Sequence, residues 1–248
     1  MKRLFILLGK SVLALLSVAG VLLLAFEGWL IWHVEYGIGL PTETQLAALP
    51  GTGALCSSKP GNLDLPLNQI PPFLQRAVIA SEDPGFDHQT WMNPVAQLIV
   101  AIFTGRRPQG SVITFRVSRH CLFALAPDCC RGLDWHLGNL VFMGRIERVL
   151  SYDRIIEAYL NDSYFGRGAY GLATGATAYF GKPLERLDVD EIAFLVARLR
   201  QPYPNKRDRD LRNFVIDKMR TAGLIDEQQA AIAKAAPLPW LDNQPRDL

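Results

Sequence analysis

Two adjacent carboxylates, Glu82 and Asp83, end an apolar run that begins at Ala77 and are followed by Pro84 and Gly85. The spacing of the apolar residues predicts a helix, with the acidic pair at its C-terminal end. Burial at such a helix end removes water from a carboxylate and raises its pKa toward that of a working general base. The alternative is a solvated turn without chemistry. The pair is therefore a candidate catalytic centre that needs support from residues elsewhere.

That support comes from further blocks in the same chain. In order, they are residues 110–114 (GSVIT), 155–166 (IIEAYLNDSYFG), 178–182 (AYFGK) and 211–219 (LRNFVIDKM). The most specific block is Tyr-x-Asn-x-x-Tyr-x-Gly, which begins at Tyr159. Together with the acidic pair, these blocks resemble the signatures of glycosyltransferase family 51, from about Leu67 to Pro239. This family is the lipid II polymerase module of class A penicillin-binding proteins and of monofunctional peptidoglycan transglycosylases.

The resemblance implies a mainly α, lysozyme-like domain. It also implies a reaction in which the 4-hydroxyl of one lipid-linked disaccharide attacks the anomeric carbon of the growing chain and expels a lipid diphosphate. Such an attack needs a base at the hydroxyl and cations at the departing diphosphate. By resemblance, Glu82 is the base, with Asp83 beside it. The substrate-binding residues expected on the same grounds are Ser111, Thr114, Arg116, Arg119, Arg131 and Asn139.

Several positions depart from the family pattern. The second catalytic glutamate of the family, in an Arg-Lys-x-x-Glu block, is represented by Asn139, which cannot carry a charge or transfer a proton at neutral pH. Phe115 and Arg116 stand where the family has Gln-Gln after its Gly-Ser block. Gln89 and Trp91 replace the His and Gly of the Phe-x-x-His-x-Gly motif. The substitutions concentrate on residues expected to face substrate, whereas the scaffold helices match well.

Three functions are therefore weighed. The first is a divergent peptidoglycan glycosyltransferase whose activity is impaired by the loss at position 139. The second is an inactive family member that binds lipid-linked disaccharide-peptide precursor, glycan strands or a cell-wall synthesis protein. The third is glycan cleavage by a single acid in a lysozyme-like cleft. The residues require no cofactor and suggest no metal site, while the family resemblance is compatible with a divalent cation.

The N-terminus predicts a membrane anchor. Residues 4–32 are apolar apart from Lys10 and Glu27, and at 1.5 Å per residue they reach about 43 Å, enough to cross a bilayer. The run exceeds the h-region of about 7–15 residues typical of a cleaved signal peptide, and it lacks the polar stripe of a soluble core helix. Positive charge before the span, at Lys2, Arg3 and Lys10, places the N-terminus in the cytoplasm and the main domain in the periplasm.

Charge and cysteine content bear on the class of partner and on the redox compartment. The formal net charge of +2 and the absence of a Lys/Arg run exclude a nucleic-acid partner. The four cysteines fit an oxidising compartment. A bridge from Cys121 to Cys129 or Cys130 is the one pairing expected, while the full pairing of these two with Cys56 and Cys121 is left open. The histidines are scattered without metal-ligand spacing.

Three segments are expected: a cytoplasmic N-terminus and anchor over residues 1–36, a tether or loosely packed lead-in over 37–66, and the glycosyltransferase-like domain over 67–248. The lead-in is rich in Gly, Pro, Ser and Thr without periodicity. Helices are predicted after Pro71, over 93–105, over 133–149, after the cap Ser151, and over 190–199. A further helix over 230–236 is predicted to follow a capping box of Asp226 with Gln229. No run of alternating strands is predicted.

Overall fold

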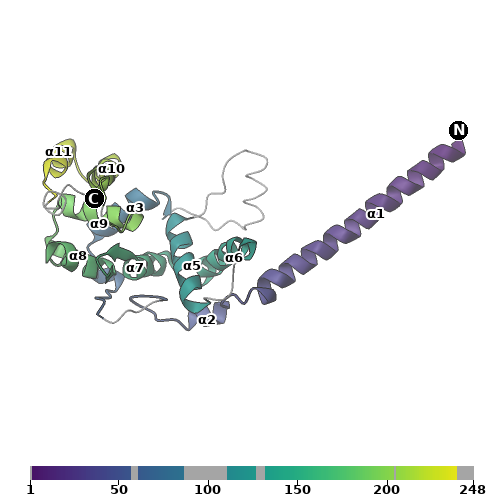
Figure 1. Ribbon diagram of the computed structural model, residues 1–248, viewed down its shortest axis with the longest axis horizontal. Coiled ribbons are helices and arrows are strands. Elements are labelled where there is room, and N and C mark those ends of the chain that lie inside the picture. The colour runs from purple at the N-terminus through teal and green to yellow at the C-terminus, as the bar shows by residue number, and fades with distance from the viewer. Residues whose placement is uncertain (1, 57–60, 87–110, 127–131, 204, 239–248) are drawn as a thin grey trace.

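The computed structural model describes residues 2–56, 61–86, 111–126, 132–203 and 205–238, and within these ranges the chain is mainly α-helical (Figure 1). This confirms the predicted fold class. A long helix, α1 (Lys2–Trp32), extends away from a body of shorter helices. The helices of the body are α2 (Glu43–Ala47), α3 (Pro72–Glu82), α5 (Val112–Leu125), α6 (Leu133–Val149), α7 (Tyr152–Asp162), α8 (Leu172–Phe180), α9 (Val189–Arg200), α10 (Asp208–Thr221) and α11 (Glu227–Ala235).

Three short helical segments connect these elements: the π-helix η1 (His33–Gly37) and the 3₁₀ helices η2 (Leu67–Gln69) and η4 (Leu184–Arg186). The predicted helix starts agree with the observed caps. The Ser151 side chain accepts from the backbone N–H of Arg154 at the start of α7, and Asp226 forms a capping box with Gln229 at the start of α11. The helix predicted over 93–105 lies outside the described residues.

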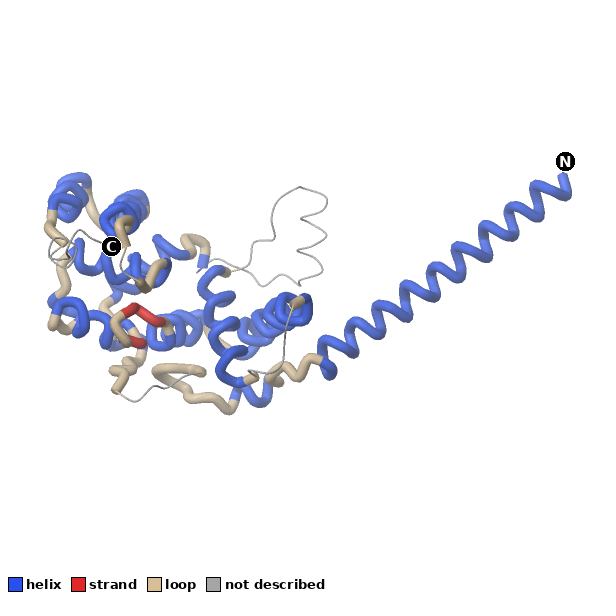
Figure 2. Tube along the Cα trace, viewed as in Figure 1, coloured by secondary structure: helices blue, strands red, loops and turns tan. Residues whose placement is uncertain are grey.

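A small antiparallel hairpin follows α7, and the sequence did not predict it. Its strands are β1 (Tyr164–Gly166) and β2 (Ala169–Tyr170), shown in red in Figure 2. Two strands this short carry too few alternating positions to show a period of two. Gly166 has φ +92°, and a Cβ there would overlap the Pro202 carbonyl oxygen and the Tyr179 hydroxyl. The glycine of the Tyr-x-Asn block is therefore required by close backbone packing.

Helix α9 forms the centre of the core. Its residues 193–197 are fully buried, and it packs against α3, α8, α10 and α11. Arg198 on the same helix is also fully buried, forms an ion pair with the buried Asp208 at the start of α10, and stacks 4.5 Å over the Phe194 ring. Because separating a buried charge pair is costly, this pair fixes α9 and α10 relative to each other.

The lead-in expected over residues 37–66 is packed more tightly than the sequence predicted. Two side chains of α7 hold its backbone: the Glu157 carboxylate accepts from the N–H groups of Gly53 and Leu67, each at 2.6 Å, and Asn161 both donates to and accepts from Leu65. Residues 38, 40, 46, 54 and 55 are buried. The expectation of a loose tether was wrong, because these backbone groups are satisfied by residues about 100 positions away.

The cysteine pairing is a second correction. Cys56 of the lead-in forms a disulfide with Cys121 on α5, so the bridge expected from Cys121 to Cys129 or Cys130 was wrong. Asp162, at the end of α7, accepts from the backbone N–H groups of Leu55 and Cys56 and so positions the lead-in beside α5. Cys129 and Cys130 themselves lie outside the described residues.

Among the described residues, α1 is the one helix long and apolar enough to cross a membrane, with a mean hydropathy of 2.1 over Ala14–Trp32 and no burial in that stretch. Polar contacts attach its C-terminal end to the body. The His33 ring lies 3.1 Å from Asp134 on α6, and Arg145 of the same helix donates to the carbonyl oxygens of Leu40 and Pro41. The chain that follows α1 is therefore fixed to α6.

Candidate functional site

The Glu82 carboxylate is the centre of the candidate site. Proline at the start of α3 presets the first turn, and Leu74, Ala77 and Val78 bury one face of the helix, which carries Glu82 into the protein at its last residue. Its side chain is only 1% exposed. The solvated helix end considered as the alternative is therefore excluded.

Two arginines from different helices contact this carboxylate. Arg200, the last residue of α9, donates from Nε to Glu82 Oε1 at 2.6 Å. Arg116 on α5 places Nη2 at 3.5 Å from Glu82 Oε2 and donates from Nη1 to the Leu199 carbonyl oxygen at 2.6 Å. Glu82 is thus held between two guanidinium groups that connect α3, α5 and α9.

Arg200 was not predicted as a site residue, because a basic residue at the C-terminal end of a helix already interacts favourably with the helix dipole. The structure gives Arg200 three partners: besides Glu82, its Nη2 donates to the Ser81 carbonyl oxygen at 2.7 Å, and its guanidinium stacks 4.9 Å over the Phe214 ring. No local signal distinguishes such a residue, because its hydrogen-bond partners Glu82 and Ser81 lie 118 and 119 positions away.

A cavity of about 490 Å³ lies beside this cluster. It combines three arginine side chains with aromatic walls, and its lining residues are Arg116, Val117, Arg119, His120, Phe123, Tyr159, Asp162, Ser163, Tyr164, Leu199, Arg200 and Pro202. Arg119 stacks over the rings of Phe123 and Trp135 at 5.8 and 5.9 Å. The concentration of guanidinium groups makes the cavity suited to an anionic ligand.

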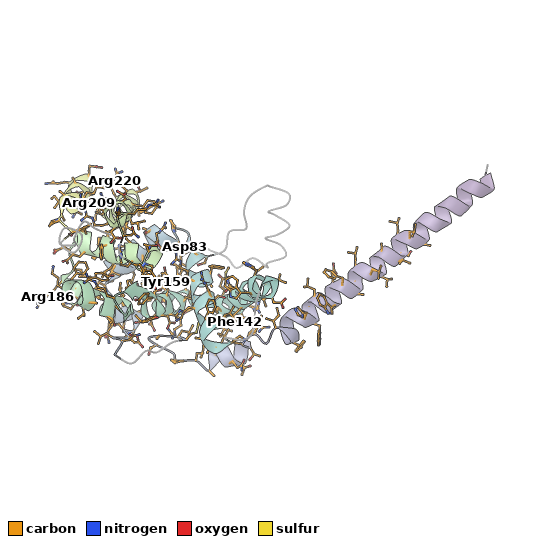
Figure 3. The ribbon with its side chains drawn as sticks, viewed as in Figure 1. Asp83, Phe142, Tyr159, Arg186, Arg209 and Arg220 are labelled. Atoms are coloured by element: carbon orange, nitrogen blue, oxygen red, sulfur yellow. A yellow bond between two sulfur atoms is a disulfide. The ribbon has the colours of Figure 1, made fainter. Side chains whose placement is uncertain are left out.

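Tyr159 connects Glu82 to the cavity. It lines the cavity wall from α7 and is almost fully buried. Burial raises the pKa of the Tyr159 hydroxyl, and the negative charge of Glu82 raises it further, while Arg116 and Arg200 act in the opposite direction. The hydroxyl is therefore a neutral group beside the carboxylate at neutral pH. Figure 3 shows Asp83 and Tyr159 in the middle of the body, between Phe142 and Arg220.

Asp83 has a different position from its neighbour. It is buried, and its Oδ2 accepts from the Ser111 hydroxyl at 2.8 Å, while Ser111 Oγ accepts from the Thr114 N–H as the N-cap of α5. Thr114 is fully buried beside Glu147 of α6. These three predicted site residues therefore form a buried link between α3 and α5 and are not among the residues that line the cavity. Their roles toward substrate stay predictions.

Burial raises the pKa of the Glu147 carboxyl above its ordinary value near 4.5, the Thr114 hydroxyl lowers it, and the Asp83 charge raises it. Glu147 was not predicted as a site residue from the sequence. The structure adds it to the acidic groups behind the site.

Asn139, expected to bind substrate, also lies away from the cavity lining. Its side chain is 1% exposed, and its Oδ1 accepts from the Ser118 hydroxyl at 2.8 Å between α6 and α5. Arg131, Gln89 and Trp91 lie outside the described residues, so their predicted contributions are untested. Of the six expected substrate-binding residues, the structure places Arg116 and Arg119 on the cavity wall.

Within the described part of the chain, one group of ligand atoms is close enough to hold a metal: Cys56, Cys121 and Asp162. Its sulfur atoms form the disulfide, and Asp162 Oδ2 accepts two backbone hydrogen bonds. We therefore interpret this group as a structural link that holds the lead-in against α5 and α7.

The protein thus combines a helical domain with a buried carboxylate that is paired with arginines on the wall of a cationic cavity. The family model for transglycosylases matches residues 54–220, more than half of the chain, and the chain belongs to that family. This confirms the resemblance to glycosyltransferase family 51.

Relatives with this similarity include penicillin-binding protein 1A of Escherichia coli, 36% identical over 173 residues that cover 66% of this chain and 20% of the relative. Penicillin-binding protein 1A of Mycobacterium tuberculosis is 37% identical over 146 residues, or 56% of this chain and 17% of the relative. That of Rickettsia bellii is 32% identical over 253 residues, or 92% of this chain and 31% of the relative. The chain therefore spans about a third or less of the length of these curated relatives.

Proposed function

We propose that this chain is a membrane-anchored peptidoglycan glycosyltransferase that joins lipid-linked disaccharide-peptide units into glycan strands. The observation that carries the proposal is the position of Glu82, whose carboxylate contacts two of the three arginines that line the cavity. A base and a set of cations at one place are what transfer from a sugar diphosphate requires. Membership of the transglycosylase family supports the reaction class.

In the proposed reaction, the 4-hydroxyl oxygen of one disaccharide forms a bond to the anomeric carbon of the growing chain. The bond from that carbon to the lipid diphosphate breaks, and the hydroxyl proton passes to Glu82. Arg116 and Arg119 stabilise the charge that develops on the departing diphosphate, since guanidinium forks suit phosphate oxygens. No cofactor enters this scheme.

The proposed location is the cytoplasmic membrane of a bacterium, with one span and the body on the periplasmic side. The apolar stretch within α1 supports the span, and Lys2, Arg3 and Lys10 before it favour a cytoplasmic N-terminus. The Cys56–Cys121 disulfide fits an oxidising compartment. Other cell-wall synthesis proteins are proposed as partners.

A second candidate is favoured by a specific observation. Glu82 is already engaged by Arg200, and the position of the family's second carboxylate holds Asn139, whose amide is bonded to Ser118. These contacts suit a protein that binds lipid-linked precursor in the cationic cavity without turning it over.

Polymerisation of labelled lipid II by the purified full chain in detergent separates the two candidates. We expect glycan product from the natural chain and a loss of about 100-fold or more for Glu82→Gln, since general bases contribute about 10²–10⁴-fold. Glu43→Gln is the matched control, because Glu43 forms an exposed ion pair with Arg148 on another face. Equal product from both variants would remove Glu82 from the mechanism, and binding without product would establish the second candidate. Parallel reactions with Mg²⁺ and with EDTA test for a divalent cation.

A further inference from the structure

Glu82 and the cavity share the same two guanidinium groups. Arg116 and Arg200 both line the cavity, and both contact the Glu82 carboxylate behind it. Their side chains are 37% and 36% exposed, whereas that of Glu82 is 1% exposed. Each arginine therefore has one part facing the carboxylate and another part accessible from the cavity.

The two contacts differ in strength. Arg200 donates a charge-assisted hydrogen bond to Glu82 at 2.6 Å, while the Arg116 contact is an ion pair at 3.5 Å. Arg200 also rests on the Phe214 ring and on the Ser81 carbonyl oxygen, so it is held at the end of α9 in a defined place. Arg200 therefore engages Oε1 of the carboxylate, whereas Oε2 is buried and accepts no hydrogen bond within the described residues.

We propose that Arg200 is a latch on Glu82, and that a diphosphate entering the cavity competes for the Arg200 guanidinium and so frees Oε1 of the carboxylate. In the absence of ligand, Glu82 acts as an internal anion that occupies the cationic site. The ligand's phosphate oxygens replace it, because they present the same charge and the same acceptor geometry to the guanidinium. The inference concerns the site of the proposed function, but it can be tested without turnover.

Competition between an internal and an external anion has a measurable signature. Glu82→Gln removes the internal charge, so inorganic pyrophosphate should bind the variant at least about fivefold more tightly than the natural chain, at the lower end of typical coupling between sites. Arg200→Gln should weaken binding. When Arg200→Gln is already present, adding Glu82→Gln should raise the pyrophosphate affinity by only about twofold or less, because there is no Arg200 guanidinium left to release.

The experiment is a calorimetric double-mutant cycle on the detergent-solubilised full chain, with inorganic pyrophosphate as the probe. Glu43→Gln and Arg220→Gln are the matched controls. Glu43 forms an exposed ion pair with Arg148, and Arg220 forms one with Glu227. None of these four residues lines the cavity, and each substitution removes one charge as the test variants do. Both should bind pyrophosphate as the natural chain does. If Arg200→Gln does not fold, Arg200→Lys keeps the charge, removes the Nε donor and should shift binding in the same direction.

Different results would contradict the latch and the proposed function. A gain from Glu82→Gln that persists undiminished without Arg200 would overturn the latch, because it would reflect only the removal of nearby negative charge. A failure of both the natural chain and Glu82→Gln to bind pyrophosphate would also overturn it. Coupling between Glu82 and Arg200 without lipid II polymerisation would support the latch and reject catalysis. Polymerisation without this coupling would support catalysis and reject the latch.

A parallel titration with a long-chain polyprenyl diphosphate distinguishes a lipid-borne diphosphate from a free one.

Discussion

The Asn139 side-chain oxygen accepts a hydrogen bond from the Ser118 hydroxyl at 2.8 Å, and this bond joins α6 to α5 in the interior of the body. The Asn139 backbone carbonyl accepts from the same hydroxyl at 3.2 Å. The sequence resemblance predicts the family's second catalytic carboxylate at position 139. In this chain the Asn139 side chain instead joins two helices and satisfies a buried hydroxyl donor.

Restoring the family's residue should therefore destabilise the fold. Asn139→Glu would bury an ionised carboxylate at a position where the described residues provide the Ser118 hydroxyl and no paired cation, at a cost of about 3–5 kcal/mol in the free energy of unfolding at pH 7. At pH 4 the cost should be smaller, because the carboxyl is largely protonated. Chemical denaturation at both pH values measures the effect, and Ser118→Ala, which should cost about 1 kcal/mol, is the comparison. A glutamate variant as stable as the natural chain would show that position 139 reaches solvent or the cavity.

Asn161→Asp should loosen the lead-in. The Asn161 amide nitrogen donates to the carbonyl oxygens of Leu65 and Glu157, and a carboxylate cannot replace either bond. We expect a loss of about 1–3 kcal/mol in the free energy of unfolding and faster proteolysis over residues 61–66. Asn68→Asp, at an exposed position close by, makes the same chemical change and should alter neither measurement. Unchanged proteolysis of both variants would mean that Asn161 does not hold this segment.

The Cys56–Cys121 disulfide should contribute substantially to stability. It joins residues 65 positions apart and staples the lead-in to the buried face of α5. Replacing both cysteines with alanine should lower the free energy of unfolding by about 2–5 kcal/mol, a range typical of disulfides in small exported domains. Peptide mapping of the non-reduced chain by mass spectrometry should recover Cys56 linked to Cys121. Recovery of Cys121 linked to Cys129 or Cys130 would contradict the structure.

Glu147 should make stability depend on pH. Burial raises its pKa in the folded chain above the value near 4.5 of an unfolded carboxyl, so the folded state holds the proton more tightly. The resulting stabilisation is complete below the unfolded pKa and is lost as the pH rises through the folded pKa. Glu147→Gln should therefore be more stable relative to the natural chain at pH 7 than at pH 4, as measured by thermal unfolding. An identical difference at the two pH values would exclude this titration.

Local sequence signals predicted most of the helices, because their causes are local. The apolar spacing over 133–149, the Ser151 cap and the Asp226 capping box each act within one or two helical turns, and each is present in the structure. The prediction for the lead-in failed because its causes are not local. Its backbone partners are Glu157 and Asn161, about 100 residues away, so a segment without periodicity was interpreted as loose.

The candidate site likewise contains residues that the sequence predicted and residues that it did not. Family motifs, together with the chemistry of diphosphate transfer, were sufficient to bring Glu82, Arg116 and Arg119 together. Arg200 lies 118 positions from Glu82, and its charge already had a local explanation at the end of a helix, so nothing in the chain sequence indicated the contact. Asn139 and Ser111 were expected at substrate because the motifs record which positions matter but do not distinguish a contact with substrate from a contact within the fold.

The buried pair of Arg198 and Asp208 determines how Arg200 can move. Arg198 lies two positions before Arg200 on α9, so turning this helix about its axis would separate the pair, at a cost of about 3–5 kcal/mol. Arg200 must therefore leave Glu82 by rotation about its own side-chain bonds, which also breaks its hydrogen bond to the Ser81 carbonyl oxygen and its stacking on the Phe214 ring. Release of Glu82 then requires the movement of one side chain and no rearrangement of the helices.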